Sequence, residues 1–364
     1  FEYENTWLQR PEAFAFDPDL ALHGGPQYPP ADRNNFGIFL DSAPDRWGRV
    51  LMQRRESLRA RKEKRKPNAL TEWDYLLGVS DETRVGALRF RATPDGPFLD
   101  STLRLPAPPI TSLRELQTAS LQIERHLDDE DNPEYGRWLM QLVAPGTSLG
   151  GARPKASVQD EEGALCIAKF PSNQDTRDIG AWELVAHRLA EKAGIRVPVT
   201  QAIRMPKSPY ATFLARRFDR TPQARRLAFV SAMTLTQHVD GDAGVSYLEL
   251  VDLLQSRGAN TYYDCVELFR RVVFNILIHN TDDHLRNHGF FIAEHGITLS
   301  PAFDLNPSIE RNDLTLAINE VETTCDVKIA LEACGDYGLT QSEADGIYRQ
   351  VADAVAPWRR AAAA

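Results

Sequence analysis

Apolar positions in the middle of the chain repeat at helical spacing. Within residues 181–193, Trp182, Val185, Ala186 and Leu189 follow one another in steps of three, one and three residues. This spacing places the four side chains on one face of a helix. We therefore predict an amphipathic helix here, packed by that face against a core.

The other elements follow from apolar spacing, turn residues and capping pairs. Strands are predicted at residues 156–158, 164–170 and 210–218. Helices are predicted at residues 112–126, 133–143, 247–256 and 265–279, with a last helix after the Thr340/Glu343 capping box. These three strands lie before residue 220, and helices dominate from about residue 230, which predicts an α+β fold with a β-containing front half and a mostly helical back half.

The chain is long enough for several lobes, and we expect three domains. Residues 1–105 form a mixed first domain, and the proline-rich stretch 103–109 is typical of a linker. The second domain, 106–220, opens on a helix with a predicted Ser112/Glu115 capping box. Residues 221–364 make the helical third domain.

Composition excludes several classes of protein. With 42% hydrophobic and 26% charged residues, the chain is typical of a soluble globular protein. No run approaches the roughly 18 apolar residues of a membrane span, so we expect no membrane partner. The four cysteines lack CxxC spacing, which argues against zinc and disulfides and favours the cytoplasm; they are Cys166, Cys265, Cys325 and Cys334.

The net charge of −9 argues against broad direct binding of nucleic acid by this chain alone. Residues 54–66, with the sequence RRESLRARKEKRK, are a basic exception. Two interpretations stay open for them: a solvated helix face, which we favour, and a surface that contacts phosphate.

Three polar residues near position 290 have the spacing of a phosphoryl-transfer centre. Asp282 is followed five residues later by Asn287, and Asp304 comes after an apolar strand and a turn. Protein kinases place their catalytic aspartate and two Mg²⁺ ligands in this order. Asp283 lies only four residues before the asparagine, so the spacing favours Asp282 as the catalytic residue.

Candidate groups for holding nucleotide phosphates occur earlier in the chain. Residues 145–155 form a glycine-rich turn between a predicted helix and hairpin, although the turn lacks the Lys-Ser/Thr of a P-loop. Lys169 shares a strand face with Leu165 and Ile167, an unusual place for a charge, and two interpretations stay open: a phosphate ligand, or an edge-strand lysine whose ammonium group extends to solvent. Glu183, on the next predicted helix, is a candidate partner for it.

Four histidines invite a metal-hydrolase interpretation, but their spacings match no common zinc pattern; they are His279, His284, His288 and His295. The oxygen ligands Asn287 and Asp304 suit Mg²⁺ better. His284 has two open interpretations, a phosphate contact or an ordinary loop histidine, and His279 suits a helix C-terminus.

Taken together, these segments resemble the HipA family of bacterial toxin kinases over nearly the whole chain, and in the family's order. The matching segments are residues 41–49 (DSAPDRWGR), 148–155 (SLGGARPK), 167–171 (IAKFP), 217–220 (RFDR), 281–287 (TDDHLRN) and 303–304 (FD). The resemblance implies a two-lobed protein-kinase-like fold.

The resemblance also implies a role for each matching residue. Asp282 would be catalytic, Asn287 and Asp304 would hold Mg²⁺, and Ser148 would be a regulatory autophosphorylation site. Residues expected to contact ATP are the phosphate loop Gly150, Gly151, Ala152, Arg153, Pro154 and Lys155, then Lys169, the hinge Arg216, Arg217 and Phe218, and His284, Asn287 and Asp304.

By the same resemblance the chain would be an ATP- and Mg²⁺-dependent serine/threonine protein kinase. It would act as the toxin of a toxin–antitoxin pair, with a protein substrate such as an aminoacyl-tRNA synthetase. A HipB-like helix-turn-helix antitoxin would bind it, with residues 1–105 as the expected docking surface, and would link it indirectly to DNA. One alternative is a mainly non-enzymatic co-repressor, and another is a small-molecule or lipid kinase of related fold.

Overall fold

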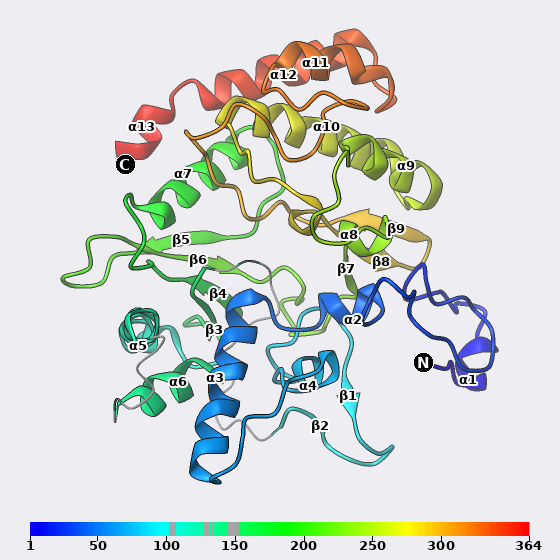
Figure 1. Ribbon diagram of the computed structural model, residues 1–364. Coiled ribbons are helices and arrows are strands. Elements are labelled where there is room, and N and C mark those ends of the chain that lie inside the picture. Colours follow the sequence, from blue (N-terminus) through cyan, green and yellow to red (C-terminus); the bar gives the residue numbers. More distant parts are fainter. Residues whose placement is uncertain (102–106, 127–131, 133, 144–150, 152, 364) are drawn as a thin grey trace. The chain divides into compact units, whose positions relative to one another are not determined.

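The computed structural model describes residues 1–101, 107–126, 132, 134–143, 151 and 153–363 (Figure 1). They form two compact units. The sheet unit comprises residues 29–181 and Val199–Leu227, and the helical unit comprises Phe1–Tyr28, Trp182–Pro198 and the chain from Ala228. These units do not follow the expected boundaries at 105 and 220, because residues 29–101 belong to the sheet unit and residues 1–28 to the helical unit.

The sheet unit is built on four antiparallel strands in the order β3-β4-β6-β5. The strands are β3 (Lys155–Gln159), β4 (Leu165–Lys169), β5 (Thr200–Ile203) and β6 (Thr212–Arg216). The sequence predicted three of them. It missed β5, whose residues are half-buried or exposed and lack a continuous apolar run.

Two helices cover one face of this sheet (Figure 1): α5 (Leu113–Arg125) and α6 (Tyr135–Val143). The core between them and the strands includes Leu139, Val158 and Leu214. Both helices were predicted, but the Ser112/Glu115 capping box was wrong. The 3₁₀ turn η1 (Ile110–Ser112) gives Ser112 helical dihedrals, so its hydroxyl makes no cap bond.

The first part of the sheet unit is helical, with a small hairpin. Its elements are α2 (Gly37–Asp41), α3 (Arg46–Lys62), α4 (Glu72–Leu77), β1 (Phe90–Arg91) and β2 (Phe98–Leu99). The Asp45 carboxylate caps α3 by accepting from the Gly48 N–H at 2.7 Å. Trp47, Leu51 and Leu58 of α3 pack on the core described above, which joins this part to the sheet.

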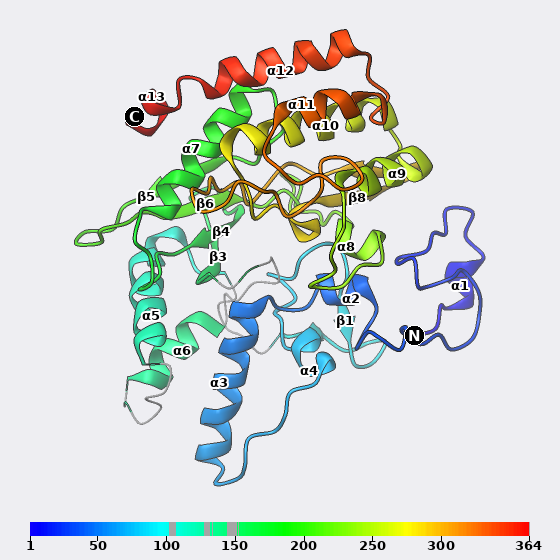
Figure 2. The same cartoon turned by 45° about the horizontal axis from the view of Figure 1, so that its top comes forward.

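The helical unit surrounds a three-stranded antiparallel sheet of order β7-β8-β9. The strands are β7 (Phe229–Ser231), β8 (Gly289–Ala293) and β9 (Gly296–Leu299); the helices are α1 (Asn5–Leu8), α7 (Ile179–Lys192), α8 (Ala232–Leu235), α9 (Tyr247–Arg257), α10 (Thr261–Ile278), α11 (Val327–Glu332), α12 (Gln341–Val355) and α13 (Trp358–Ala363), with the short turns η2 (Leu285–Asn287) and η3 (Ala333–Gly335). Helix α10 is buried over most of its length between Asp264 and Ile276, and α12 packs beside it (Figure 2).

Two local features fix the chain around this small sheet. The predicted Thr340/Glu343 capping box is present and opens α12. At the start of β8, a Cβ on Gly289 would lie 2.1 Å from the ring of Phe229, so only glycine allows β7 to approach so closely. None of the described helices is long and apolar enough to cross a membrane.

Candidate functional site

The loop that follows α10 is shaped by how the helix ends. His279 is the C-cap of α10, with a left-handed φ of 53°, and this sends the chain sharply out of the helix. Asn280 then donates its side-chain amide to Asn275 Oδ1 at 3.2 Å. The expectation that His279 is a helix-terminal residue is confirmed.

The two neighbouring aspartates of this loop have opposite environments. Asp282 is exposed, whereas Asp283 is 3% exposed and accepts hydrogen bonds from Tyr247 Oη at 2.6 Å, Asn275 Nδ2 at 2.8 Å and His288 Nε2 at 2.8 Å. Burial alone would raise the pKa of Asp283, but the charge of His288 and these hydrogen bonds lower it below its ordinary value. Asp283 therefore anchors the loop, and Asp282 is the carboxylate that a substrate can reach.

Asn287 is connected to the same loop. It is largely buried, and its Nδ2 donates to the backbone carbonyl of Asp282 at 3.2 Å. This bond uses the amide nitrogen, so Oδ1 is the atom suited to a cation. One residue earlier, Arg286 pairs bidentately with Asp240, both distances being 2.9 Å, while His284 is half-buried at the start of η2.

The β8–β9 hairpin returns the chain to this loop. Asp304 then adopts a left-handed φ of 58°, and Asn306 Nδ2 donates to its Oδ1 at 3.1 Å. The backbone N–H of Asn306 reaches Asn280 Oδ1 at 3.4 Å, and that of Ser308 reaches the carbonyl of His279 at 2.8 Å. Hydrogen bonds thus hold the segment with Asp304 against the loop with Asp282 and Asn287.

The donor set of these two segments suits a hard cation. Among the described residues, no group of three or more histidine, cysteine or acidic side chains is arranged to hold a metal ion. Asn287 and Asp304 would instead give two oxygen ligands. Mg²⁺ binds in this way, with one or two protein ligands and the remaining positions filled by phosphate oxygens and water.

In the sheet unit, Lys169 lies on the less buried face of β4, which it shares with half-buried Leu165 and Ile167. Its Nζ lies 5.7 Å from the ring centroid of Phe213 on β6. The opposite face of the strand is fully buried, so a polar ligand could reach only the face of Lys169. Glu183 belongs to the other unit and is 1% exposed, and its pairing with Lys169 stays a prediction.

Gly150 and Ala152 of the expected phosphate loop lie outside the described residues, as does Ser148, the expected autophosphorylation site. Gly151 has a φ of 93°, a conformation that favours glycine. The Arg153 guanidinium pairs bidentately with Asp175 at 2.9 and 2.7 Å, and the carbonyl of Pro154 accepts from the N–H of Phe170 at 2.8 Å. The phosphate role of this loop stays a prediction.

Lys155, also expected to contact phosphate, has a buried partner. Its side chain is 2% exposed, and its Nζ lies 2.9 Å from Oδ2 of Asp45, whose side chain is 1% exposed. Burial raises the pKa of Asp45 above its ordinary value, although the Lys155 ammonium opposes that shift. A Cβ on Gly151 would be 3.2 Å from the same Nζ, so the ammonium lies directly beneath the glycine. Lys155 thus joins the glycine turn to the start of α3.

The expected hinge follows β6. The backbone N–H of Arg216 donates to the carbonyl of Val199 and that of Arg217 to the carbonyl of Leu165, both at 2.8 Å. The Arg216 guanidinium pairs with Asp160 at 2.7 Å and with Glu162 at 2.6 Å. These two N–H groups are therefore used within the protein, and adenine contacts by Arg216, Arg217 and Phe218 stay a prediction.

The Arg217 side chain belongs to a buried network that the sequence did not reveal. It pairs bidentately with Asp219, at 2.9 and 2.6 Å, and donates to the carbonyls of Thr83 and Arg84 at 2.6 and 3.1 Å. Asp219 accepts from the N–H of Gly86 at 2.8 Å. Burial alone would raise the pKa of Asp219, but Arg217 and its hydrogen bonds hold it below the ordinary value. The RFDR segment therefore clamps residues 83–86.

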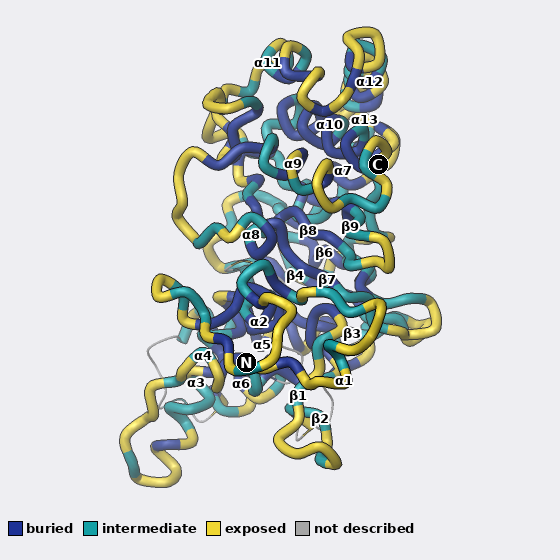
Figure 3. Tube along the Cα trace, turned by 90° about the vertical axis from the view of Figure 1, so that its right-hand side faces the viewer, coloured by how far each residue is buried: buried dark blue, intermediate teal, exposed yellow. Residues whose placement is uncertain are grey.

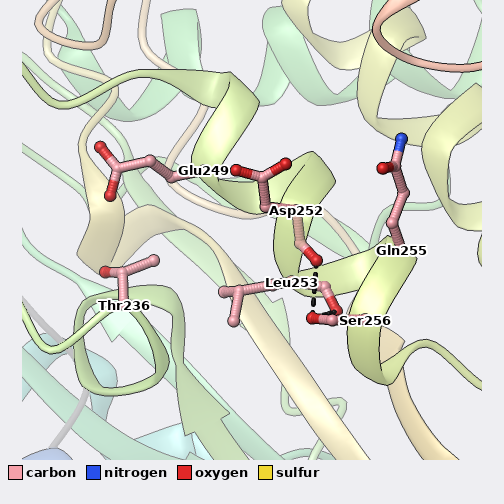
Figure 4. A pocket seen from close by; sticks show the side chains of 6 residues that line it. All are labelled: Thr236, Glu249, Asp252, Leu253, Gln255 and Ser256. Carbon is pink, nitrogen blue, oxygen red and sulfur yellow. Dashed lines mark hydrogen bonds between the residues drawn. The ribbon is translucent and has the colours of Figure 1, made fainter.

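A surface hollow of about 590 Å³ lies elsewhere in the helical unit, along α9 (Figure 4). It is lined by Thr236, Glu249, Asp252, Leu253, Gln255 and Ser256. Glu249 accepts from Nε2 of His238 at 2.7 Å, and Asp242 faces Nδ1 of the same ring at 2.8 Å. Burial lowers the pKa of His238, but these carboxylates raise it overall. The hollow contains none of the expected site residues.

Comparison with known proteins supports the family suggested by the sequence. Residues 147–358 match the model of the HipA-like C-terminal domain. Among solved structures, the Shewanella oneidensis MR-1 toxin–antitoxin protein HipA, in complex with HipB and its operator DNA, is similar with a TM-score of 0.65 and 18% identity, covering 99% of this chain and 84% of that one. This likeness confirms the α+β, HipA-like kinase fold.

A second structure, the Helicobacter pylori proinflammatory kinase CtkA, has a TM-score of 0.39 and 12% identity over 57% of this chain and 92% of that one, too low for an argument. No curated protein sequence matches significantly. The matched residues include most of the glycine turn, β4, the loop of Asp282 and Asn287, and Asp304, and they make up more than half of the chain. The chain therefore belongs to the HipA-like family.

Proposed function

We propose that this protein is an ATP- and Mg²⁺-dependent serine/threonine protein kinase that acts as the toxin of a toxin–antitoxin module. One observation carries the proposal: Asp282 is exposed on a loop that Asp283 anchors, Asn287 is hydrogen-bonded to that loop, and Asp304 is joined to it through Asn306, whose backbone N–H donates to Asn280. Protein kinases use such an aspartate with such a pair of ligands.

In the proposed reaction, Asp282 orients the attacking hydroxyl and accepts its proton as the hydroxyl oxygen bonds to the γ-phosphorus of ATP, while the bond from that phosphorus to the bridging oxygen breaks and ADP leaves. A bound Mg²⁺ would neutralise charge on the phosphates. Asn287 and Asp304 would hold it through side-chain oxygens, and Lys169 would balance the remaining phosphate charge. Catalysis of this kind rests on positioning and electrostatics, so the anchoring of the loop matters as much as the groups themselves.

The toxin role rests on membership of the HipA-like family and on the fold shared with a HipA bound to HipB and operator DNA. By that analogy, the chain would bind a helix-turn-helix antitoxin and reach DNA through it. A translation component such as an aminoacyl-tRNA synthetase is the candidate substrate class, and Ser148 the candidate autophosphorylation site. A mainly non-enzymatic co-repressor is the second candidate function, favoured by the same similarity.

The test is transfer of radiolabelled phosphate from ATP in the presence of Mg²⁺. The purified protein is first treated with a phosphatase, which removes any phosphate already attached to it. We expect label on the wild type and none on Asp282→Asn or Ser148→Ala. Asp252→Asn is the matched control, because it removes the same charge from an exposed site on α9. Adding a purified aminoacyl-tRNA synthetase then tests the substrate class.

The outcomes separate the two candidate functions. Equal labelling of wild type and Asp282→Asn would reject the assignment of the catalytic residue. Label on Ser148→Ala with none on Asp282→Asn would move the modified residue elsewhere and keep the kinase. Absence of label on the dephosphorylated wild type, with and without a protein substrate, would reject the kinase and leave the co-repressor.

A further inference from the structure

The end of α3 and the turn after it carry most of the basic character that the sequence showed. Six lysine or arginine residues and one glutamate fall within residues 59–66, a net charge of +5 in a chain of net charge −9. Apart from Ala60 and the half-buried Arg65, these residues are exposed (Figure 3). We call residues 59–66 the basic tip.

Pairing within the protein satisfies part of this charge. Glu63 accepts from Arg59 at 2.8 Å and from Arg65 at 2.6 Å, and Arg65 also reaches Glu56 at 2.6 Å. Lys62, Lys64 and Lys66 are exposed, and no ion pair with a described residue involves them. Three cations of the basic tip therefore face solvent.

Stabilisation of a helix end does not explain so many cations. Residues Arg59, Arg61 and Lys62 lie in the last turn of α3, where positive charge favours the dipole. Lys64 and Lys66 lie beyond the helix, where the dipole gives them no such benefit. A net charge of +5 within eight residues is self-repelling, and an anion beside the basic tip would relieve that repulsion.

The composition of the basic tip indicates which anion it fits. Residues 59–66 contain no aromatic side chain on which an unpaired base could stack and no large apolar side chain that could enter a lipid surface. Contacts would come from ammonium and guanidinium groups alone. A duplex offers a regular row of phosphates for such groups, about one charge per 1.7 Å of helix axis.

We propose that the basic tip binds the phosphate backbone of duplex DNA. The choice of DNA rests on the proposed function, in which an antitoxin brings this chain to DNA. Net charge opposes binding by the rest of the surface, so the basic tip would make a local contact without sequence preference. The α3 end would thus strengthen an assembly whose sequence specificity comes from the antitoxin.

The test is fluorescence anisotropy of a labelled duplex of about 30 base pairs, titrated with the full chain at about 50 and 200 mM salt. The test variant is Lys62→Gln/Lys64→Gln/Lys66→Gln. The matched control is Lys192→Gln/Lys207→Gln/Lys328→Gln, three exposed lysines elsewhere. Each set removes three charges and includes one residue of positive φ, Lys64 at 54° or Lys207 at 68°.

We expect the basic-tip variant to bind roughly ten-fold more weakly and to lower the slope of log affinity against log salt by about 3, since each phosphate contact contributes about 0.9. The control should bind like the wild type. Equal binding by both variants, no wild-type binding at low salt, or tighter binding to single-stranded RNA or anionic phosphatidylserine vesicles would each overturn the proposal.

Phosphate transfer by the basic-tip variant, measured separately, distinguishes this proposal from the proposed function. The lysines lie outside the candidate site, so labelling from ATP should equal that of the wild type. A kinase-inactive chain that binds duplex through these lysines would leave the present inference standing while rejecting the kinase.

Discussion

Replacing Lys155 with methionine removes one half of the buried ion pair with Asp45. Both side chains are 2% exposed or less, and the Nζ–Oδ2 distance is 2.9 Å. Methionine keeps most of the volume of the lysine stem, so the main effect is a carboxylate left buried without a counter-charge. Breaking such a pair costs about 3–5 kcal/mol of unfolding free energy.

This magnitude predicts a large change in thermal stability. One kcal/mol corresponds to about 2–4 °C for a unit of 150–250 residues, so we expect the unfolding temperature to fall by roughly 6–20 °C. Circular dichroism melts measure it. The double variant Lys155→Met/Asp45→Asn should recover most of the loss, because the asparagine amide oxygen can still cap α3 at Gly48.

Three results would refute this reasoning. If Lys155→Met melted within about 2 °C of the wild type, the pair would not be stabilising the fold. If it kept its stability but needed far more ATP for half-maximal labelling, Lys155 would be a phosphate ligand, as the sequence alone suggested. A double variant as unstable as the single one would show that lost packing, not the unpaired carboxylate, is the cause.

Three further predictions concern the helical unit. Asp282→Asn should lower phosphate transfer by about 10²–10⁴-fold with little change in melting temperature, because the side chain is exposed; a comparable loss of stability would contradict this. Asp283→Ala should instead destabilise the unit by about 3 kcal/mol or more in chemical denaturation, since it leaves three buried donors unpaired; an unchanged midpoint would contradict it. Because the pKa of His238 is raised in the folded state, its stabilising effect is complete below about pH 6.5 and is lost as the pH rises through the folded-state pKa. The difference in melting temperature between the wild type and His238→Gln should therefore be larger at acid than at alkaline pH. A difference that does not depend on pH would contradict this prediction.

Sequence spacing was informative for candidate site residues that lie close together along the chain. Asp282 and Asn287 lie five residues apart on one loop, and the apolar run after them correctly indicated the hairpin that leads to Asp304. The choice of Asp282 over Asp283 rested on spacing alone; burial now gives a physical reason for it. Helices with strong periodicity, such as α10 and α12, were also found, with ends displaced by a few residues.

Contacts between distant segments could not be predicted from one sequence. Asp45 and Lys155 are 110 positions apart, and Asp45 showed only the local pattern of a residue before a helix. Arg217 and Asp219 looked like part of a hinge motif, and nothing in their neighbourhood indicated residues 83–86. Such pairings depend on how the whole unit packs, which propensity and spacing do not encode.

The clamp between the RFDR segment and residues 83–86 has a consequence for how this protein can be divided. A fragment starting at residue 106 would contain every residue of the family model, which begins at 147, yet it would lack the carbonyls of Thr83 and Arg84. The guanidinium of Arg217 would then lose two hydrogen-bond acceptors, and the segment that now buries it would be missing. Expression of the matched region alone should yield insoluble or unfolded material, because residues 29–101 are an integral part of the sheet unit.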